Sequence, residues 1–286
     1  MAGVTASGQS AWPGAVESLL PDPGHPNFLR WRAYHKSASW RGAMVQSMLG
    51  PLLPPHAVVL DIGCGTGGTS IALAAKGAMV LAVEVDRARL EATRALAGAA
   101  GVPVRLVLAD GCTLPCADQS CHAVVLQDVL EHVSAPERLV REAARALKPG
   151  GVAFVSTPNR WSPLNALSDP HWGLPGVAML PRKVVGRCTK ARRGAAALPA
   201  PALLSLRRLR WLMRMAGLDM SFANRDAARF IAAEPRAALC APFHLRIAAW
   251  AKRRGLLKFL PAMVNDRLGL FNCWVNPNWY ILAKKR

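Results

Sequence analysis

The sequence predicts an α/β fold in which helices cover both faces of a mostly parallel sheet. Between residues 57 and 156, short apolar runs typical of buried strands alternate with helical stretches about ten residues long. Strands that alternate with helices in this way pair in parallel and are covered on both sides. A chain of 286 residues that is 52% apolar can bury one large core. We therefore expect one domain with insertions.

The part of the chain before this alternating region has a different character. Residues 1–28 are rich in glycine, proline, alanine and serine, which is typical of a mobile leader. Residues 29–49 have a helical pattern, which the prolines and glycine of residues 50–55 would end. We expect residues 1–55 to be a leader and one helix, and residues 56–286 to be the folded domain.

The expected elements of the folded domain can be placed by residue number. Strands are expected at 57–62, 79–85, 104–109, 122–127 and 152–156, with helices near 67–76, 87–100 and 135–147. These form a core, residues 56–160. Residues 158–201 hold seven prolines and a basic run, which indicates a long insertion. In the last part, residues 202–286, we expect a helix at 203–215, a short strand at 218–223 and a final strand at 278–283.

Positive charge is concentrated in the second half of the chain. The net charge is +19, of which residues 160–286 contribute +18. Such a field can attract nucleic acid, an anionic membrane or an anionic substrate. Residues 239–260 interleave apolar side chains such as Trp250 with lysines and arginines, a pattern of peripheral membrane helices. A helix that packs on the core with a solvated charged face would give the same pattern.

Targeting signals and cysteines bear on location and metal binding. We find no membrane-spanning run and no secretory signal, so we expect a cytoplasmic protein, with peripheral contact at the inner membrane surface through residues 239–260. Seven scattered cysteines suit reduced thiols. The spacing of Cys112, Cys116, Cys121 and His122 departs from paired zinc ligands. We therefore predict no metal site.

A glycine-rich turn follows the first expected strand and predicts a ligand site. The strand ends at Asp61 and runs into Gly63, Gly65 and Gly67, where the absence of side chains lets a ligand approach the backbone. The same glycines, with Gly68, also fit a dinucleotide fingerprint. Asp61 sharpens the prediction, because a carboxylate there would repel a pyrophosphate and attract a cation.

Two more carboxylates follow the next two strands. Glu84 ends the second strand, where it can accept both hydroxyls of a ribose, and Asp110 follows the third, where it can accept the amine of an adenine. Buried acids without partners are costly, so three at successive strand ends are hard to explain by packing. Together with Asp61 they outline an adenosine with a cationic tail.

These residues resemble class I S-adenosylmethionine-dependent methyltransferases, in particular the small-molecule branch that includes quinone-biosynthesis enzymes. The resemblance is close over about residues 55–160. Its motifs here are Leu60–Gly67, Glu84, Asp110-Gly111, Gln127–Val133 and Leu147–Gly151. It implies a Rossmann-like three-layer sandwich with seven strands, the last antiparallel, and S-adenosylmethionine as cofactor. It also implies that the main chain near Gly111 and Gln127 lines the cofactor site.

One departure from the family pattern stands at the start of the fourth strand. Relatives usually have an aromatic residue followed by aspartate there, whereas this chain has Cys121-His122. The departure affects the beginning of that strand and not the cofactor contacts.

The sequence indicates a methyl acceptor less sharply than it indicates the cofactor. Methyl transfer is a direct displacement, so a base is needed only when the acceptor must lose a proton. His132 could accept a hydroxyl proton as a neutral imidazole. In some quinone O-methyltransferases, the counterpart of Asp128-x-x-Glu131-His132 resembles a metal site. The sequence favours the more general interpretation that the Glu131-His132 pair is a helix start shared by methyltransferases of many specificities.

The sequence therefore predicts methyl transfer to a small-molecule or lipid-like acceptor, with three alternatives. An NAD(P)-dependent oxidoreductase would use the glycine pattern and Tyr280-x-x-x-Lys284. An RNA-binding protein or RNA methyltransferase would use the basic half of the chain. A third alternative is a methyltransferase-like binding protein without activity.

Overall fold

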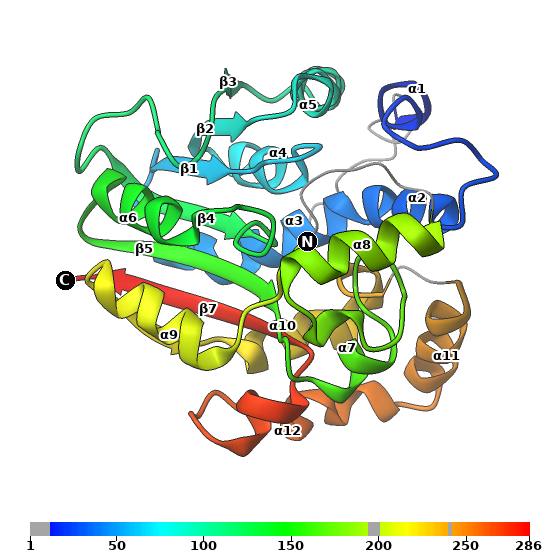
Figure 1. Cartoon of the computed structure of the whole chain (residues 1–286). Coiled ribbons are helices and arrows are strands. Elements are labelled where there is room, and N and C mark those ends of the chain that lie inside the picture. The colour runs from blue at the N-terminus through cyan, green and yellow to red at the C-terminus, as the bar shows by residue number, and fades with distance from the viewer. Residues whose placement is uncertain (1–11, 194–200, 240–241) are drawn as a thin grey trace.

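The computed structural model describes residues 12–193, 201–239 and 242–286, which form one seven-stranded sheet with helices on both faces (Figure 1). The strand order is β3-β2-β1-β4-β5-β7-β6. The strands are β1 (Val58–Ile62), β2 (Met79–Glu84), β3 (Val104–Leu108), β4 (Cys121–Gln127), β5 (Leu147–Pro158), β6 (Leu218–Phe222) and β7 (Asn278–Lys285). Strands β1 to β5 are parallel and β7 is antiparallel to both of its neighbours. The predicted fold class is confirmed.

The sheet is covered by two sets of helices, so its middle strands are buried on both sides. These helices and their neighbours are α2 (Phe28–Lys36), α3 (Ala38–Leu49), α4 (Gly68–Ala74), α5 (Arg87–Ala100), α6 (Pro136–Ala146), α9 (Leu206–Met215) and α10 (Asn224–Ala233). Residues of α3, α4 and α10 pack with Phe154 in one core, whereas residues of α6 and α9 pack with Trp279 in the other. Val124 and Val125 point to opposite faces of β4 and are both fully buried.

Two regions differ from the sequence-based expectation. The helix expected at 29–49 is two helices, α2 and α3, which meet at Ser37, where the hydroxyl donates to the Tyr34 carbonyl. Part of the expected leader is helical, since α1 (Trp12–Glu17) forms and its Val16 is buried. The leader's residues 1–11 lie outside the described residues.

The insertion is largely helical within its described part, whereas its residues 194–200 lie outside the description. It contains α7 (Pro163–Leu167), η3 (Val177–Met179) and α8 (Arg182–Arg193). Arg182 donates to the carbonyl oxygens of Glu131 and Val133 at 2.9 and 2.7 Å, which fastens α8 to the segment after β4. The insertion therefore lies against the carboxyl end of the sheet.

One remaining described element, η2 (Gly50–Leu52), joins α3 to the segment before β1, and the others lie in the basic half. The latter are η4 (Pro235–Ala237), α11 (Pro242–Arg253), η5 (Leu256–Phe259), α12 (Leu260–Met263) and η6 (Phe271–Val275). In the part of the chain that the structure describes, no helix has the length and apolar character needed to cross a membrane.

Helices α3 and α4 touch through two glycines that permit backbone contact. A β-carbon added to Gly42 would lie 2.1 Å from the Gly68 carbonyl oxygen, and one added to Gly68 would lie 2.2 Å from the Ala38 carbonyl oxygen. Both neighbours are backbone atoms, so no side chain can rotate away. This contact positions the first turn of α4, which follows the glycine-rich turn.

We expect Gly42→Ala to lower the free energy of unfolding by about 1–3 kcal/mol, because overpacking must push α3 and α4 apart. Gly98→Ala is the matched control, since a β-carbon at this position of α5 meets no atom within 4 Å. The control should raise stability by about 0.4–1 kcal/mol through the unfolded state. Urea denaturation measures both, and an equal effect of the two variants would contradict the α3–α4 contact.

Candidate active site

The glycine-rich turn lies at the carboxyl end of β1 and needs glycine at two positions. Gly63 has a φ of 69°, and a β-carbon on it would lie 2.7 Å from a methyl carbon of Val129. Gly67 has a φ of 77°, and its added β-carbon would lie 2.5 Å from Cγ2 of Thr93. Both left-handed backbone and lack of space exclude larger residues. The turn therefore presents bare backbone at this edge.

Glu84, at the end of β2, binds this turn directly. Its Oε2 accepts a hydrogen bond from the Gly65 amide at 2.9 Å. Its Oε1 accepts hydrogen bonds from the amides of Val85 and Asp86 at 2.9 and 3.1 Å. The residue is only 5% exposed. The carboxylate is thereby fixed beside the turn, where it retains acceptor capacity for a hydroxyl.

Asp61 is in β1, directly before the turn, and its side chain is hydrogen-bonded to α4. It is 2% exposed, and its Oδ2 accepts the Ser70 hydroxyl at 2.6 Å. Burial, with a smaller contribution from the nearby Glu84 charge, raises the pKa of Asp61 from 3.8 to about 6. A carboxylate held at this cost favours a cation close to it.

Asp110, Gly111 and Gln127 complete the predicted cofactor set with different environments. Asp110 is exposed, and its Oδ1 accepts the Cys112 amide at 2.8 Å. A β-carbon on Gly111 would lie 2.6 Å from Ile62 and 2.8 Å from Leu139. The Gln127 side chain accepts the Thr69 hydroxyl at 2.6 Å, so it binds α4. Contacts therefore join Glu84 to Gly65 and Gln127 to α4, while Asp110 remains at the exposed edge.

A second group of polar side chains lies after β4. Glu131 is fully buried, and its Oε2 accepts the Thr157 hydroxyl at 3.0 Å. His171 Nε2 lies 4.0 Å from Glu131 Oε1, which has no hydrogen-bond partner among the described residues. The rings of His132 and His171 meet edge to face with centroids 4.8 Å apart. His132 is three residues from Val129, which covers Gly63, so this group is close to the turn.

The two imidazoles differ in exposure, since His132 is exposed and His171 is half-buried. Partial removal from water lowers the pKa of His132, assisted by His171 and Arg89, and lowers that of His171 to about 4, assisted by Arg30. Burial and the neighbouring Asp128 raise the pKa of Glu131 to about 8. The group is therefore close to neutral at pH 7.

Asp128 stands out by its backbone. Its φ is 55°, uncommon for a residue other than glycine, and its Oδ1 accepts the Ser156 hydroxyl at 2.7 Å. Burial raises its pKa. Strained backbone at a sheet edge is typical of functional sites.

His171 reaches this group because the loop of residues 168–174 is tightly held. Asp169 accepts the amides of His171, Trp172 and Leu174. Trp31 of α2 donates its indole N–H to the His171 carbonyl at 3.2 Å. The sequence does not predict the contact between His171 and His132. That contact depends on α2 and on the insertion, which are far from His132 in the sequence.

Among the described residues, one group has donors placed for a metal ion. One donor atom each from Glu131, His132 and His171 lies within 4.8 Å of the others, a mixed oxygen and nitrogen set that could hold a divalent cation. The pattern Asp128-x-x-Glu131-His132 suggested a site here, but Asp128 binds Ser156 instead. The absence of a metal remains a prediction.

Parts of the chain are similar to a known domain family and to curated proteins. Residues 60–155 match the family described as a methyltransferase domain. A ubiquinone biosynthesis O-methyltransferase from Idiomarina loihiensis is 41% identical over 105 residues, which are 36% of this chain and 42% of that protein. The chain thus spans less than half the length of the curated relatives it matches.

Two solved structures share the fold over most of both chains. A possible histamine N-methyltransferase from Thermotoga maritima has a TM-score of 0.53 at 20% identity and covers 90% of this chain and 93% of that one. A geranyl diphosphate C-methyltransferase from Streptomyces coelicolor A3(2), in complex with S-adenosyl-L-homocysteine, has a TM-score of 0.52 at 18% identity and covers 94% and 87%.

The strand order, the glycine turn with its acid and the family match together indicate a methyltransferase domain. Residues 60–155 are similar to that family, and the sheet around them has the fold of solved methyltransferases. Over 105 residues the chain is similar to ubiquinone biosynthesis O-methyltransferases. S-adenosylmethionine is the predicted cofactor, and Asp61, the turn and Glu84 remain its predicted contacts.

The raised pKa of Asp61 predicts a pH effect on stability without ligand. The folded state holds this proton to about pH 6 and the unfolded state only to about pH 4, so ionisation destabilises the fold as pH rises. The difference in free energy of unfolding between Asp61→Asn and the unmutated protein should therefore move by about 1–2 kcal/mol in favour of the variant when the pH rises from 5 to 8.

Urea unfolding at the two pH values measures this difference. Asp226→Asn, at an exposed ion pair of α10, is the control and should keep the pH dependence of the unmutated protein. A pH dependence that Asp61→Asn leaves unchanged would show that Asp61 ionises as it does in the unfolded chain.

Proposed function

We propose that this chain transfers the methyl group of S-adenosylmethionine to an oxygen of a small, lipid-like acceptor at a membrane surface. The observation that carries the proposal is the junction of two sites at one sheet edge. The glycine turn with Glu84 adjoins, through Val129, the group of buried Glu131, exposed His132 and half-buried His171. The similarity to ubiquinone biosynthesis O-methyltransferases supports an oxygen acceptor.

The cofactor residues have separate roles in this proposal. The bound cofactor supplies a methyl group activated by a sulfonium. Glu84 accepts hydrogen bonds from the ribose hydroxyls, and Asp110 accepts one from the adenine amine. The backbone from Gly63 to Gly67 allows the cofactor to approach closely. Asp61 attracts the cationic tail, and Gly111 and Gln127 complete the wall. These residues bind and orient, which is the main source of rate in a direct displacement.

His132 is the proposed base for an acceptor that must lose a proton. The imidazole is exposed to solvent and uncharged, so one of its ring nitrogens can accept the hydroxyl proton of an acceptor. His171 and Thr157 hold the geometry around it, because they contact His132 and Glu131 respectively. The insertion, fastened by Arg182, closes this side of the site.

The alternative of an NAD(P)-dependent oxidoreductase receives little support. Tyr280 and Lys284 both lie in the extended strand β7, in which four residues span about 13 Å. Such a separation does not allow the two side chains to act together on a nicotinamide. The RNA-directed alternative rests only on the basic half of the chain.

Activity is tested by incubating the protein with S-adenosylmethionine labelled in its methyl group and a lipid extract. We expect label in a lipid product whose mass rises by one methylene. His132→Asn should lower kcat by about 10²–10⁴-fold without weakening cofactor binding, and Glu84→Gln should raise the KM for the cofactor.

Glu91→Gln is the control for the methyl-transfer assay, because Glu91 is an exposed partner of Arg94 on α5. It should behave like the unmutated protein. Label found only in RNA, or no transfer to any fraction although cofactor binds, would contradict the proposed acceptor.

The membrane part of the proposal rests on the surface formed by residues 244–275. Several of its large apolar side chains are mostly exposed, with exposed fractions of 79% for Leu270, 70% for Met263 and 55% for Phe259. Trp250 and Trp274 are each about half exposed. The predicted segment was 239–260, in which residues 240 and 241 and the Phe243 side chain lie outside the described residues, and the surface extends beyond it to Val275.

The charge of this surface favours an anionic membrane. Residues 244–275 contain six lysines and arginines and one acid, Asp266, which accepts the Arg225 amide. Arg254 lies over the Trp250 ring and Lys258 over the Phe259 ring, so cations and apolar groups share one surface. Large exposed apolar patches among cations are typical of interfacial membrane contacts.

The loop that carries the most exposed residues is firmly held. Asn272 is fully buried, and its side chain bonds Asn224, Asn276 and the backbone of Asn265 and Arg267. Its carbonyl accepts the Trp279 indole at 2.8 Å. Leu268 and Leu270 are thus presented on a rigid support.

We expect sedimentation with phosphatidylglycerol vesicles and much weaker sedimentation with phosphatidylcholine vesicles. Replacing both Arg253 and Lys258 by glutamine should weaken binding about 30-fold, at about 1 kcal/mol for each charge. Leu270→Ser should weaken it further. Replacing Arg94 and Lys76, exposed elsewhere, is the matched control.

The proposed membrane surface would be contradicted if the variant of Arg253 and Lys258 and the variant of Arg94 and Lys76 bind vesicles equally. It would also be contradicted if excess generic RNA by itself abolishes vesicle binding. The second outcome would favour the RNA-directed alternative.

A further inference from the structure

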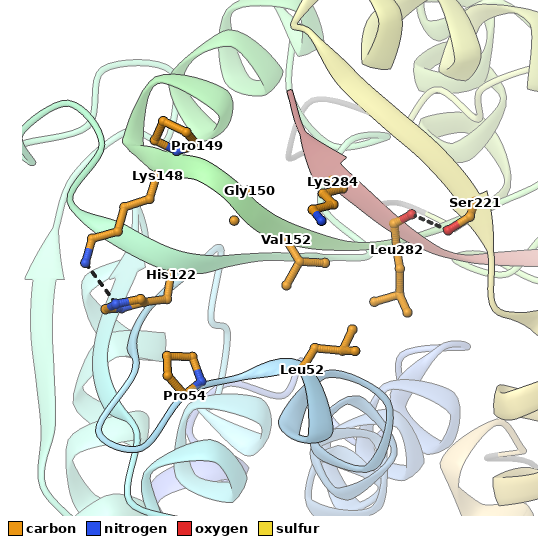
Figure 2. A pocket seen from close by; sticks show the side chains of 11 residues that line it. Leu52, Pro54, His122, Lys148, Pro149, Gly150, Val152, Ser221, Leu282 and Lys284 are labelled. Atoms are coloured by element: carbon orange, nitrogen blue, oxygen red, sulfur yellow. Dashed lines mark hydrogen bonds between the residues drawn. The ribbon is translucent and has the colours of Figure 1, made fainter.

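A surface cavity of about 450 Å³ lies at the opposite edge of the sheet from the glycine turn. It lies where β4 and β5 begin and where the antiparallel β7 ends, because Val152 pairs with both Ala123 and Lys284. Figure 2 shows Val152 and Leu282 pointing from the strands toward Leu52. Cavities of this size take small organic ligands, and a single inorganic anion would leave most of it unfilled.

The polar groups of the cavity are cationic or hydrogen-bond donors. Lys148 and Lys284 supply two ammonium groups and His122 supplies an imidazole. Among the described residues that line the cavity, none has a carboxylate. Asp219 pairs with Lys284 in register on the neighbouring strand, but both of its oxygens accept from Arg286. The excess positive charge favours an anion.

The contact between His122 and Lys148 indicates where an acceptor is needed. The Val58 amide donates to His122 Nδ1 at 3.0 Å, so in the neutral ring the proton is on Nε2. That nitrogen lies 2.8 Å from Lys148 Nζ, which also carries protons. Two donors then face each other. An anionic oxygen that accepts from both would resolve the conflict.

The other walls of the cavity are apolar. Leu52 is 54% exposed at the rim, and Val152 and Leu282 are partly exposed on the floor, although a sheet face of this kind is usually covered.

We propose that this cavity binds an anionic amphiphile, whose carboxylate or phosphate head is held by Lys148, Lys284 and the Nε2–H of His122. Its apolar body lies along Val152, Leu282 and Leu52. The cavity is separate from the methyl-transfer site, because the two lie at opposite ends of the parallel strands. Its ligand is either a free amphiphile or a lipid headgroup that the protein meets at a membrane.

Calorimetry with dodecanoate and dodecyl phosphate, below their micelle concentrations, tests the proposal on the full chain. We expect saturable binding of one molecule at this cavity, and binding at least about tenfold weaker for dodecanol and for inorganic phosphate. Lys148→Met and Lys284→Met should each weaken dodecanoate binding about tenfold, as expected for loss of one charge-assisted hydrogen bond.

Lys76→Met is the matched control, since Lys76 is exposed and lies outside the cavity. Leu52→Asp, which adds a carboxylate at the rim, should weaken binding as well. All variants leave residues 244–275 unchanged, so amphiphile held by that surface would be unaffected. Binding that survives both lysine replacements, or that is equally strong for inorganic phosphate, would overturn the proposal.

Phosphatidylglycerol vesicles distinguish the two sources of the ligand. If Lys148→Met and Lys284→Met weaken sedimentation with these vesicles and Lys76→Met does not, the head belongs to a membrane lipid. If sedimentation is unchanged, the ligand is a free amphiphile. Neither result depends on methyl transfer, so failure of this proposal and failure of the proposed activity can be told apart.

Discussion

The hydrogen bond from the Gly65 amide to the Glu84 carboxylate is the contact on which the proposed cofactor site depends. It joins the ends of β1 and β2 and fixes a buried acid beside bare backbone. Both features follow from parallel strands, whose carboxyl ends meet at one edge. The other cofactor residues are placed by the same sheet, and α4 is held behind the turn by the Gly42–Gly68 contact.

The sequence predicted the core well because its signals are local. Apolar strands, the turn and the acids at strand ends are set by residues a few positions apart. The break at Ser37 was missed, because it depends on a hydroxyl that bonds its own backbone. The Asp61–Ser70 bond and the meeting of His132 with His171 were also missed, since they depend on helices and an insertion that pack from elsewhere.

In the proposed function, the basic half of the chain shapes the site for the methyl acceptor. The insertion brings His171 beside Glu131 and His132, and the Asn272 network supports an exposed apolar surface. Because Asn159, at the end of β5, donates to the carbonyls of Cys273 and Asn276, that surface adjoins the edge where methyl transfer is proposed. A lipid-like acceptor could thus reach the site without crossing water.

Calorimetric titration of the folded protein with S-adenosyl-L-homocysteine tests the central claim most directly. The account predicts saturable binding of one molecule that Glu84→Ala abolishes, with no heat from NADH. Binding of NADH in place of the adenosyl ligand, or adenosyl binding that Glu84→Ala leaves unchanged, would contradict it.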